Sequence, residues 1–72
     1  MNLLDIGTKV KQLRKEKGLT QEQLSKMVNI SRATLSKLEN GNIAQVSIVV
    51  FSDILNHLGY ELDLKASNPF MN

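Results

Sequence analysis

Two short amphipathic segments within residues 19–41, each with its own start signal, constrain the fold of this chain more than any other feature. Thr20 is followed three residues later by Gln23, the spacing of a capping box, in which two side chains satisfy free backbone N–H groups reciprocally. Ser31 is a favourable N-cap for the second segment, and Asn40-Gly41 is a typical left-handed helix end. Two such helices joined by a tight turn form a helix-turn-helix, and neither is long enough to be stable alone.

The segments on either side predict two further helices that support this pair. Residues 3–17 repeat apolar side chains at three- and four-residue steps, and Gly18 follows as a helix stop. Gly7 lies inside this segment and costs about 1 kcal/mol of helix propensity. Ser47 precedes another apolar segment, which ends before Gly59. The stripe of this segment that is expected to face the core consists of Ile48, Phe51, Leu55 and Leu58.

The apolar arc of the last helical segment is wider than a single core face requires, which indicates a second buried contact. Residues 60–65 then alternate apolar and charged side chains, the pattern of a half-buried strand, although the chain offers no second strand to pair with it. The same strand of a second copy can pair with it across a two-fold axis. For the strand, the alternative is addition to the sheet of a different protein. For the wide apolar arc, the alternative is a large core within a monomer. The expected dimer interface consists of Ile43, Val46, Val50, Ile54, Tyr60, Leu62 and Leu64.

Seventy-two residues make one domain, which we expect over residues 1–66, with the dimerising strand at about 60–65 and a flexible tail at 67–72. The sequence has no cysteine and therefore no disulfides or thiolate metal sites, so oligomerisation is the expected reinforcement. The first ten residues show no basic region followed by an apolar run, and no apolar stretch is long enough to span a membrane. We therefore expect a cytoplasmic protein with no membrane partner.

The charges are distributed unevenly along the chain. Residues 1–40 hold eight Lys or Arg and four Asp or Glu, for a net charge of +4, whereas residues 41–72 hold one and three, for −2. A basic half that coincides with the helix-turn-helix is expected of a protein that binds a polyanion. The alternative is a solvated lysine-rich face.

The second helix of the pair carries residue types that suit contacts to DNA bases. In a helix-turn-helix that reads DNA, this helix lies in the major groove with its N-terminal residues on base edges. Leu35 and Leu38 are expected to point inward, which turns the polar residues around them outward. Arginine can bond guanine with both prongs, alanine can contact a thymine methyl group, and serine can bond several base edges. The residues expected to contact bases are Ser31, Arg32, Ala33, Ser36 and Lys37.

The segment LTQEQLSKMVNISRATLSKLENG closely resembles the helix-turn-helix of phage Cro and repressor proteins, the xenobiotic-response-element family. The resemblance covers about residues 10–58. It implies an all-α, four-helix repressor-like helix-turn-helix domain, to which we add one short C-terminal β-strand pairing between subunits. It also implies an ion pair between Arg14 and Glu39. Asn29 stands where glycine is usual in the turn, and Ser25 where alanine is common. The residues expected to contact phosphates are Gln21, Thr34, Asn40 and Lys9.

The end of the fourth helical segment, HLGYELDLKA, is similar to that of HipB-like antitoxins. That resemblance implies a bacterial or phage-derived, nucleoid-associated homodimer that represses double-stranded operator DNA. It further implies an autoregulating antitoxin of a type II system, with a HipA-like kinase toxin as partner. A stand-alone phage or plasmid repressor is the alternative within this class, and a protein-interaction module without DNA binding is the alternative outside it.

An enzyme is not expected from this sequence, nor is a cofactor or a metal site. The chain has no cysteine, no carboxylate pair at catalytic spacing and no phosphate-binding glycine loop. Its solitary histidine, His57, has no second ligand candidate nearby and is expected to be a surface or interface residue.

Overall fold

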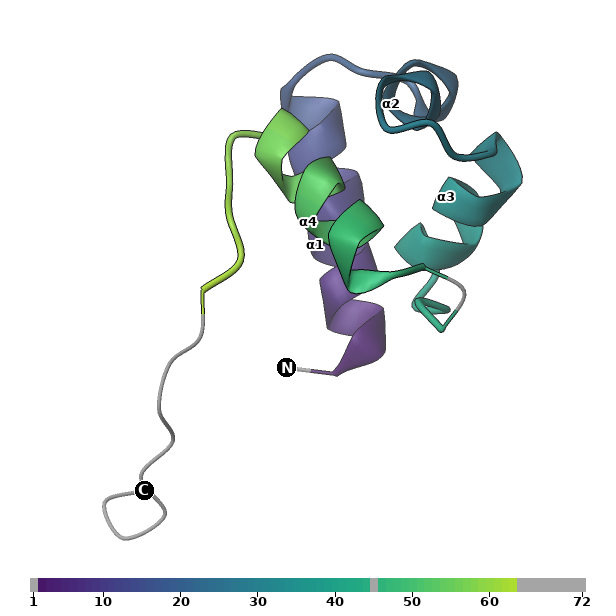
Figure 1. The fold of residues 1–72 in the computed structure, drawn as a ribbon, viewed down its shortest axis with the longest axis vertical. Helices are drawn as coiled ribbons and strands as arrows, with labels where there is room; N and C mark the ends of the chain where they lie inside the picture. The colour runs from purple at the N-terminus through teal and green to yellow at the C-terminus, as the bar shows by residue number, and fades with distance from the viewer. Residues whose placement is uncertain (1, 45, 64–72) are drawn as a thin grey trace, which may run out of the picture.

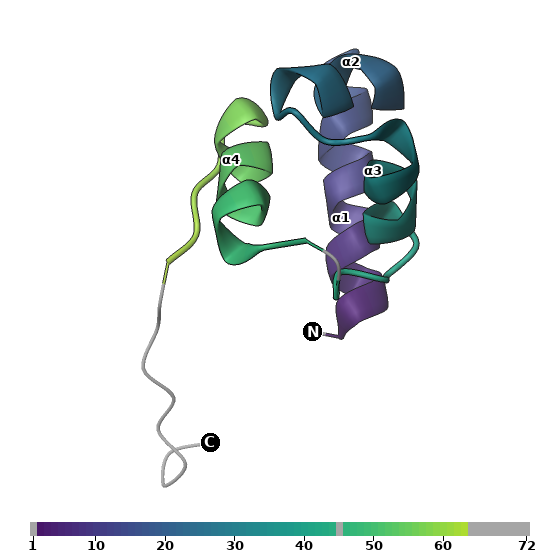
Figure 2. The same ribbon diagram turned by 45° about the vertical axis from the view of Figure 1, so that its right-hand side comes forward.

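A computed structural model describes residues 2–44 and 46–63 of the chain. Within these residues it has four helices, α1 (Leu3–Glu16), α2 (Gln21–Met27), α3 (Arg32–Glu39) and α4 (Ile48–His57). In Figure 1, α1 and α4 run in about the same direction, and α2 is seen nearly end-on to the right of the upper end of α1. The turned view of Figure 2 shows α3 beside α1, on the side away from α4. The four-helix, helix-turn-helix architecture expected from the sequence is confirmed.

Each of these helices begins at a side-chain cap. Asn2 caps α1, and Thr20 caps α2 in a capping box with Gln23. In that box the Gln23 N–H donates to the Thr20 hydroxyl at 3.0 Å, and the Thr20 N–H donates to the Gln23 side chain at 2.8 Å. Ser31 caps α3 and Ser47 caps α4 in the same way, each by accepting from a backbone N–H. The caps satisfy N–H groups that have no partner inside the helix, and those predicted at α2, α3 and α4 are confirmed.

The turn between α2 and α3 accommodates both departures from the usual family sequence. Asn29 adopts a left-handed backbone with φ of 57°, a conformation that asparagine tolerates better than most residues. The Ile30 N–H donates to the Ser25 carbonyl oxygen at 2.9 Å and closes the turn. The buried Ser25 hydroxyl donates to the Glu22 carbonyl oxygen at 2.9 Å, so it is not left without a partner.

One apolar core joins the four helices, and α4 contributes to it differently from the prediction. Ile54 and Leu58 are almost completely buried, whereas Ile48 is 68% exposed, so the predicted core stripe is wrong at Ile48. The apolar arc of α4 is so wide that its periodicity does not determine which side is buried. The buried apolar residues are Val10, Leu13, Leu24, Val28, Leu35, Leu38, Ile54 and Leu58.

Residues 60–63 follow α4 as irregular chain and form no strand in this single copy. Figure 1 shows them, in yellow-green, turning back past α4. A strand whose only partner is a second copy has no hydrogen-bonding partner in one copy. The rest of the predicted strand, with Leu64, and the predicted tail at 67–72 lie outside the described residues. The intersubunit strand therefore stays a prediction. None of the helices in the described residues is long and apolar enough to cross a membrane.

Candidate nucleic-acid interface

Helix α3 has one face in the core and one face in solvent. Leu35 and Leu38 are fully buried, which fixes the rotation of the helix about its axis. The Ser31 hydroxyl accepts from the Thr34 N–H at 3.0 Å and lies 2.8 Å from the Thr34 hydroxyl, so the first turn of α3 is held by side chains as well as by the backbone. The rigid inner face sets where every outward side chain of α3 lies.

The residues predicted to contact bases all lie on the accessible part of α3 or at its cap. Arg32, Ala33 and Lys37 are exposed, as is Ser31, and Ser36 is half-buried. Two of the predicted phosphate contacts flank this group. Thr34 is half-buried beside Ser31, and Asn40 is exposed at the C-terminal end of α3. The contacts of these residues with bases and phosphates remain predictions.

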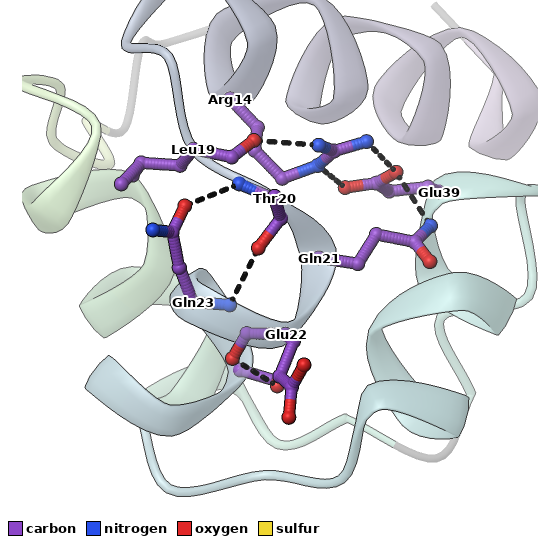
Figure 3. Close-up of polar contacts among 8 residues, drawn as sticks. Arg14, Leu19, Thr20, Gln21, Glu22, Gln23 and Glu39 are labelled. Atoms are coloured by element: carbon purple, nitrogen blue, oxygen red, sulfur yellow. Dashed lines mark hydrogen bonds and ion pairs between the residues drawn. The ribbon is translucent and has the colours of Figure 1, made fainter.

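A buried ion pair holds α3 against α1 (Figure 3). The Arg14 guanidinium donates from Nε to Glu39 Oε2 at 2.7 Å and from Nη2 to Glu39 Oε1 at 3.0 Å. A third bond runs from Arg14 Nη1 to the Leu19 carbonyl oxygen at 2.7 Å. The side chains of Arg14 and Glu39 are only 7% and 2% exposed. The geometry is the two-pronged pairing that arginine forms best, and the ion pair implied by the family resemblance is present.

Gln21 extends this network to α2. Its side-chain amide donates to Glu39 Oε1 at 3.1 Å, so one carboxylate accepts from residues of both α1 and α2 (Figure 3). Gln21 is half-buried and lies in the first turn of α2. A second N–H of the same amide is left for an outside acceptor, which suits the phosphate contact predicted for Gln21.

Gly7 is a residue whose role the sequence analysis missed. A Cβ at this position would lie 2.4 Å from the Leu38 carbonyl oxygen and 2.8 Å from both the Glu39 carbonyl oxygen and the Gly41 nitrogen. The backbone of α1 therefore approaches the end of α3 more closely than any side chain would permit. From helix propensity alone, Gly7 is only an unfavourable residue within α1. A close contact between segments that are distant in sequence leaves no local signal, so the sequence did not show why glycine is needed.

The structure separates Lys9 from the other predicted phosphate contacts. Gly7 faces α3, and a residue two positions further along a helix is turned by about 200°. Lys9 accordingly borders an apolar groove between α1 and α4, together with Phe51 and Leu62. The expectation of a phosphate contact at Lys9 thus loses its geometric basis.

The apolar residues assigned to a dimer interface differ widely in exposure. Ile54 is 0% exposed and lies wholly inside the core of its own chain, so its assignment to the interface is wrong. Ile43, Val46 and Val50 are half-buried and pack against that core. Each of these three still presents part of its surface to solvent.

The exposed apolar surface of α4 lies on residues that the interface prediction did not include. Ile48 and Val49 are 68% and 74% exposed. Tyr60 and Leu62, which were predicted, are 52% and 42% exposed, and Leu62 borders the same hollow as Ile48 and Val49. A hydrophobic helix with this much exposed apolar surface is typical of an interaction site.

The fold and this two-faced α3 define a repressor-like helix-turn-helix protein. A family model described as Helix-turn-helix matches residues 10–65, and the chain belongs to that family.

Three similar proteins illustrate the relationship. The competence pilus inhibition repressor of Acinetobacter baylyi is 49% identical over 39 residues, covering 54% of this chain and 36% of that protein. Antitoxin PezA of Streptococcus pneumoniae is 38% identical over 77 residues of alignment, covering 83% of this chain and 49% of that protein. A chain of the solved HipA-HipB-O2-O3 complex has a TM-score of 0.76 at 28% identity, with 94% of each chain covered. The chain thus spans less than half the length of the two curated relatives, but matches the HipB-type fold almost end to end.

Proposed function

We propose that the chain is a sequence-specific repressor that binds double-stranded DNA as a homodimer. The observation that carries this proposal is the division of α3 into a buried face and a polar, accessible face. Leu35 and Leu38 occupy the core, and Glu39 is bonded to α1 and α2, so α3 is held rigidly at its inner side. A helix held in this way can enter the major groove with its first turn on the base edges.

The residue types on the accessible face match the chemistry of base edges. The Arg32 guanidinium can donate two hydrogen bonds to O6 and N7 of one guanine, and Ala33 can pack on a thymine methyl group. Ser36 and Lys37 follow one turn later and can donate to acceptors on neighbouring base pairs. Arg32 and Ala33 are adjacent and favour different bases, so together they can discriminate between DNA sequences.

Substitution of Arg32 by alanine tests the assignment of α3. The probe is duplex DNA from upstream of the chain's own gene, with an unrelated duplex of equal length beside it. Arg32→Ala should weaken binding to the upstream duplex by about 5- to 150-fold, the range of one bidentate contact, and reduce its preference over the unrelated duplex. Lys26→Ala is the matched control, because it removes one positive charge from an exposed side chain already paired with Glu22. Equal affinities of wild type and Arg32→Ala would refute the assignment.

Exposed apolar residues on α4 and after it support the homodimer. Ile48, Val49, Tyr60 and Leu62 are large apolar side chains that are each more than 40% exposed. Exposed apolar side chains that gather on one surface are typical of an interaction site. Antiparallel pairing of residues 60–65 between two copies would satisfy the backbone groups of each strand and cover this surface across a two-fold axis.

The oligomeric state can be measured by sedimentation equilibrium at micromolar concentration. The wild type should sediment as a dimer, and Val49→Asp should shift it toward monomer because a buried unpaired carboxylate is costly. Thr8→Asp, which adds the same charge to an exposed position of α1, should leave the dimer intact. A monomeric wild type would refute the homodimer, and a fully dimeric Val49→Asp would exclude α4 from the interface.

We further propose the narrower role of an autoregulating antitoxin with a HipA-like kinase toxin as partner. Two similarities support it: one curated relative is named as an antitoxin, and the fold matches a chain from a complex of HipA with HipB. A pull-down from the native host with the chain as bait should recover a kinase-like protein encoded beside it. Recovery of operator DNA alone would favour a stand-alone repressor.

A further inference from the structure

A shallow hollow beside the start of α3 is lined by basic side chains from two helices. Its chain segments are the last two turns of α1, the α1–α2 connection and the first turn of α2, both drawn in Figure 3, and the first residue of α3. The residues around it are Lys11, Arg14, Lys15, Leu19, Thr20, Gln21, Glu22 and Arg32. The hollow therefore adjoins Arg32, which is proposed to contact a guanine, but most of its lining lies on the side of α1.

The charges around this hollow do not cancel. Arg14 is neutralised by the buried Glu39, and the carboxylate of Glu22 lies 3.5 Å from Lys26. Within residues 2–44 and 46–63, Lys11, Lys15 and Arg32 have no carboxylate partner. Three uncompensated positive charges thus face one small region of the surface.

Lys11 and Lys15 lie one turn apart on the same side of α1. Residues at this spacing are neighbours on a helix surface, and two like charges there repel each other. Both side chains are exposed, so neither contributes to the core. An arrangement that is unfavourable in the free protein becomes favourable when an anion lies between the two ammonium groups.

We infer that Lys11 and Lys15 bind backbone phosphate of the DNA strand that flanks the base pairs read by α3. The inference rests on the proposed DNA binding and adds a second anchoring point, on α1, to the contacts predicted for α2 and α3. An ammonium group on a flexible stem suits this role, since it can follow a phosphate whatever the base sequence. Lys9, on the same helix, is turned toward the α1–α4 groove and should not take part.

The experiment compares two double variants that each remove two positive charges. Lys11→Ala with Lys15→Ala removes the proposed clamp, and Lys9→Ala with Lys26→Ala is the matched control. Affinity for the upstream duplex is measured from low to high salt. Each lost phosphate contact should reduce the slope of log K against log salt by about 0.9, so the clamp variant should lose about 1.8. If the clamp variant and the wild type bind equally at 1 M salt, this difference in slope makes the variant bind roughly 30-fold more weakly than the wild type at 0.15 M salt.

The outcomes distinguish this inference from the proposed function. The inference is supported if the clamp variant loses affinity equally for the upstream and unrelated duplexes while the control retains the wild-type slope. It is overturned if both double variants give the same slope, even though Arg32→Ala still weakens binding. A wild type that binds no DNA overturns both proposals.

A second arm separates DNA phosphate from free phosphate. Calorimetric titration with inorganic phosphate should give the same weak heat for the wild type and the clamp variant. Saturable binding that is lost in the clamp variant, together with an unchanged salt slope for DNA, would identify a small-anion site instead. Thermal melts of both double variants that match the wild type confirm that folding is intact.

Discussion

Replacing Gly7 by alanine tests whether α1 and α3 are held at a separation that only glycine permits. The new methyl carbon would lie 2.4 Å from the Leu38 carbonyl oxygen, and 2.8 Å from the Glu39 carbonyl oxygen and the Gly41 nitrogen. Favourable carbon–oxygen contacts begin at about 3.3 Å, so the backbones must separate by up to roughly 1 Å. All three contacts are backbone atoms, which cannot rotate away as the end of a side chain could.

Two opposing effects decide how much Gly7→Ala changes the free energy of unfolding. Alanine recovers about 1 kcal/mol of helix propensity relative to glycine. Overpacking of a well-packed interior costs about 1–3 kcal/mol, and here the displaced segment also carries Glu39, whose bonds to Arg14 would lengthen. The upper part of that range therefore applies, and Gly7→Ala should lower the free energy of unfolding by about 1–2 kcal/mol. In a domain of this size the corresponding fall in Tm is about 4–16 °C.

The assay is thermal unfolding followed by circular dichroism, with Thr8→Ala as the control. Thr8 is the exposed neighbour of Gly7 in α1, so its replacement raises helix propensity without creating a contact. Thr8→Ala should therefore melt at or slightly above the wild-type temperature. If Gly7→Ala also melts at or above the wild-type temperature, the close approach of α1 and α3 is not what requires glycine.

Three further substitutions test the ion pair, the turn and the cap. Glu39→Ala leaves the Arg14 guanidinium buried without its carboxylate and should cost about 3–5 kcal/mol in urea unfolding; a cost below 1 kcal/mol would mean that the pair is not buried as described. Asn29→Ala should destabilise by about 1–2 kcal/mol because of the left-handed backbone, whereas Asn29→Gly should not; equal melting temperatures would contradict this. Ser31→Ala removes the acceptor of the Thr34 N–H and should cost about 0.5–2 kcal/mol, against a few tenths for Ser31→Gly, as measured by chemical denaturation.

The features that could be predicted from the sequence are those whose partners are close along the chain. The capping box of Thr20 with Gln23 and the caps at Ser31 and Ser47 each depend on atoms within three residues. Residue type and spacing are sufficient to specify such contacts. The side chains of α3 that point outward could also be predicted, because Leu35 and Leu38 fix which side of the helix is buried.

The features that could not be predicted depend on how distant helices cross. Gly7 is needed because α1 meets the end of α3, more than thirty residues away in sequence. The same crossing turns Lys9 away from α3. Ile48 was expected in the core and Ile54 at a dimer interface, whereas Ile54 is buried in the core and Ile48 is exposed. The apolar arc of α4 is wider than one core face, so only the placement of α4 on the other helices selects the buried side. The Arg14–Glu39 pair spans 25 residues and was available only through the family resemblance.

The division of α3 into two faces means that, apart from the cap residue Ser31, folding and recognition are carried by separate sets of side chains. Leu35, Leu38 and Glu39 hold the helix, and all three are buried on the side away from the exposed residues Arg32, Ala33 and Lys37. Substitutions at exposed positions such as Arg32 and Lys37 typically alter stability by less than about 0.5 kcal/mol. The scaffold can therefore accept many different reading surfaces at almost no energetic penalty. A randomised library at these positions should yield folded variants with new target preferences, so target choice is free to diverge while the architecture stays constant.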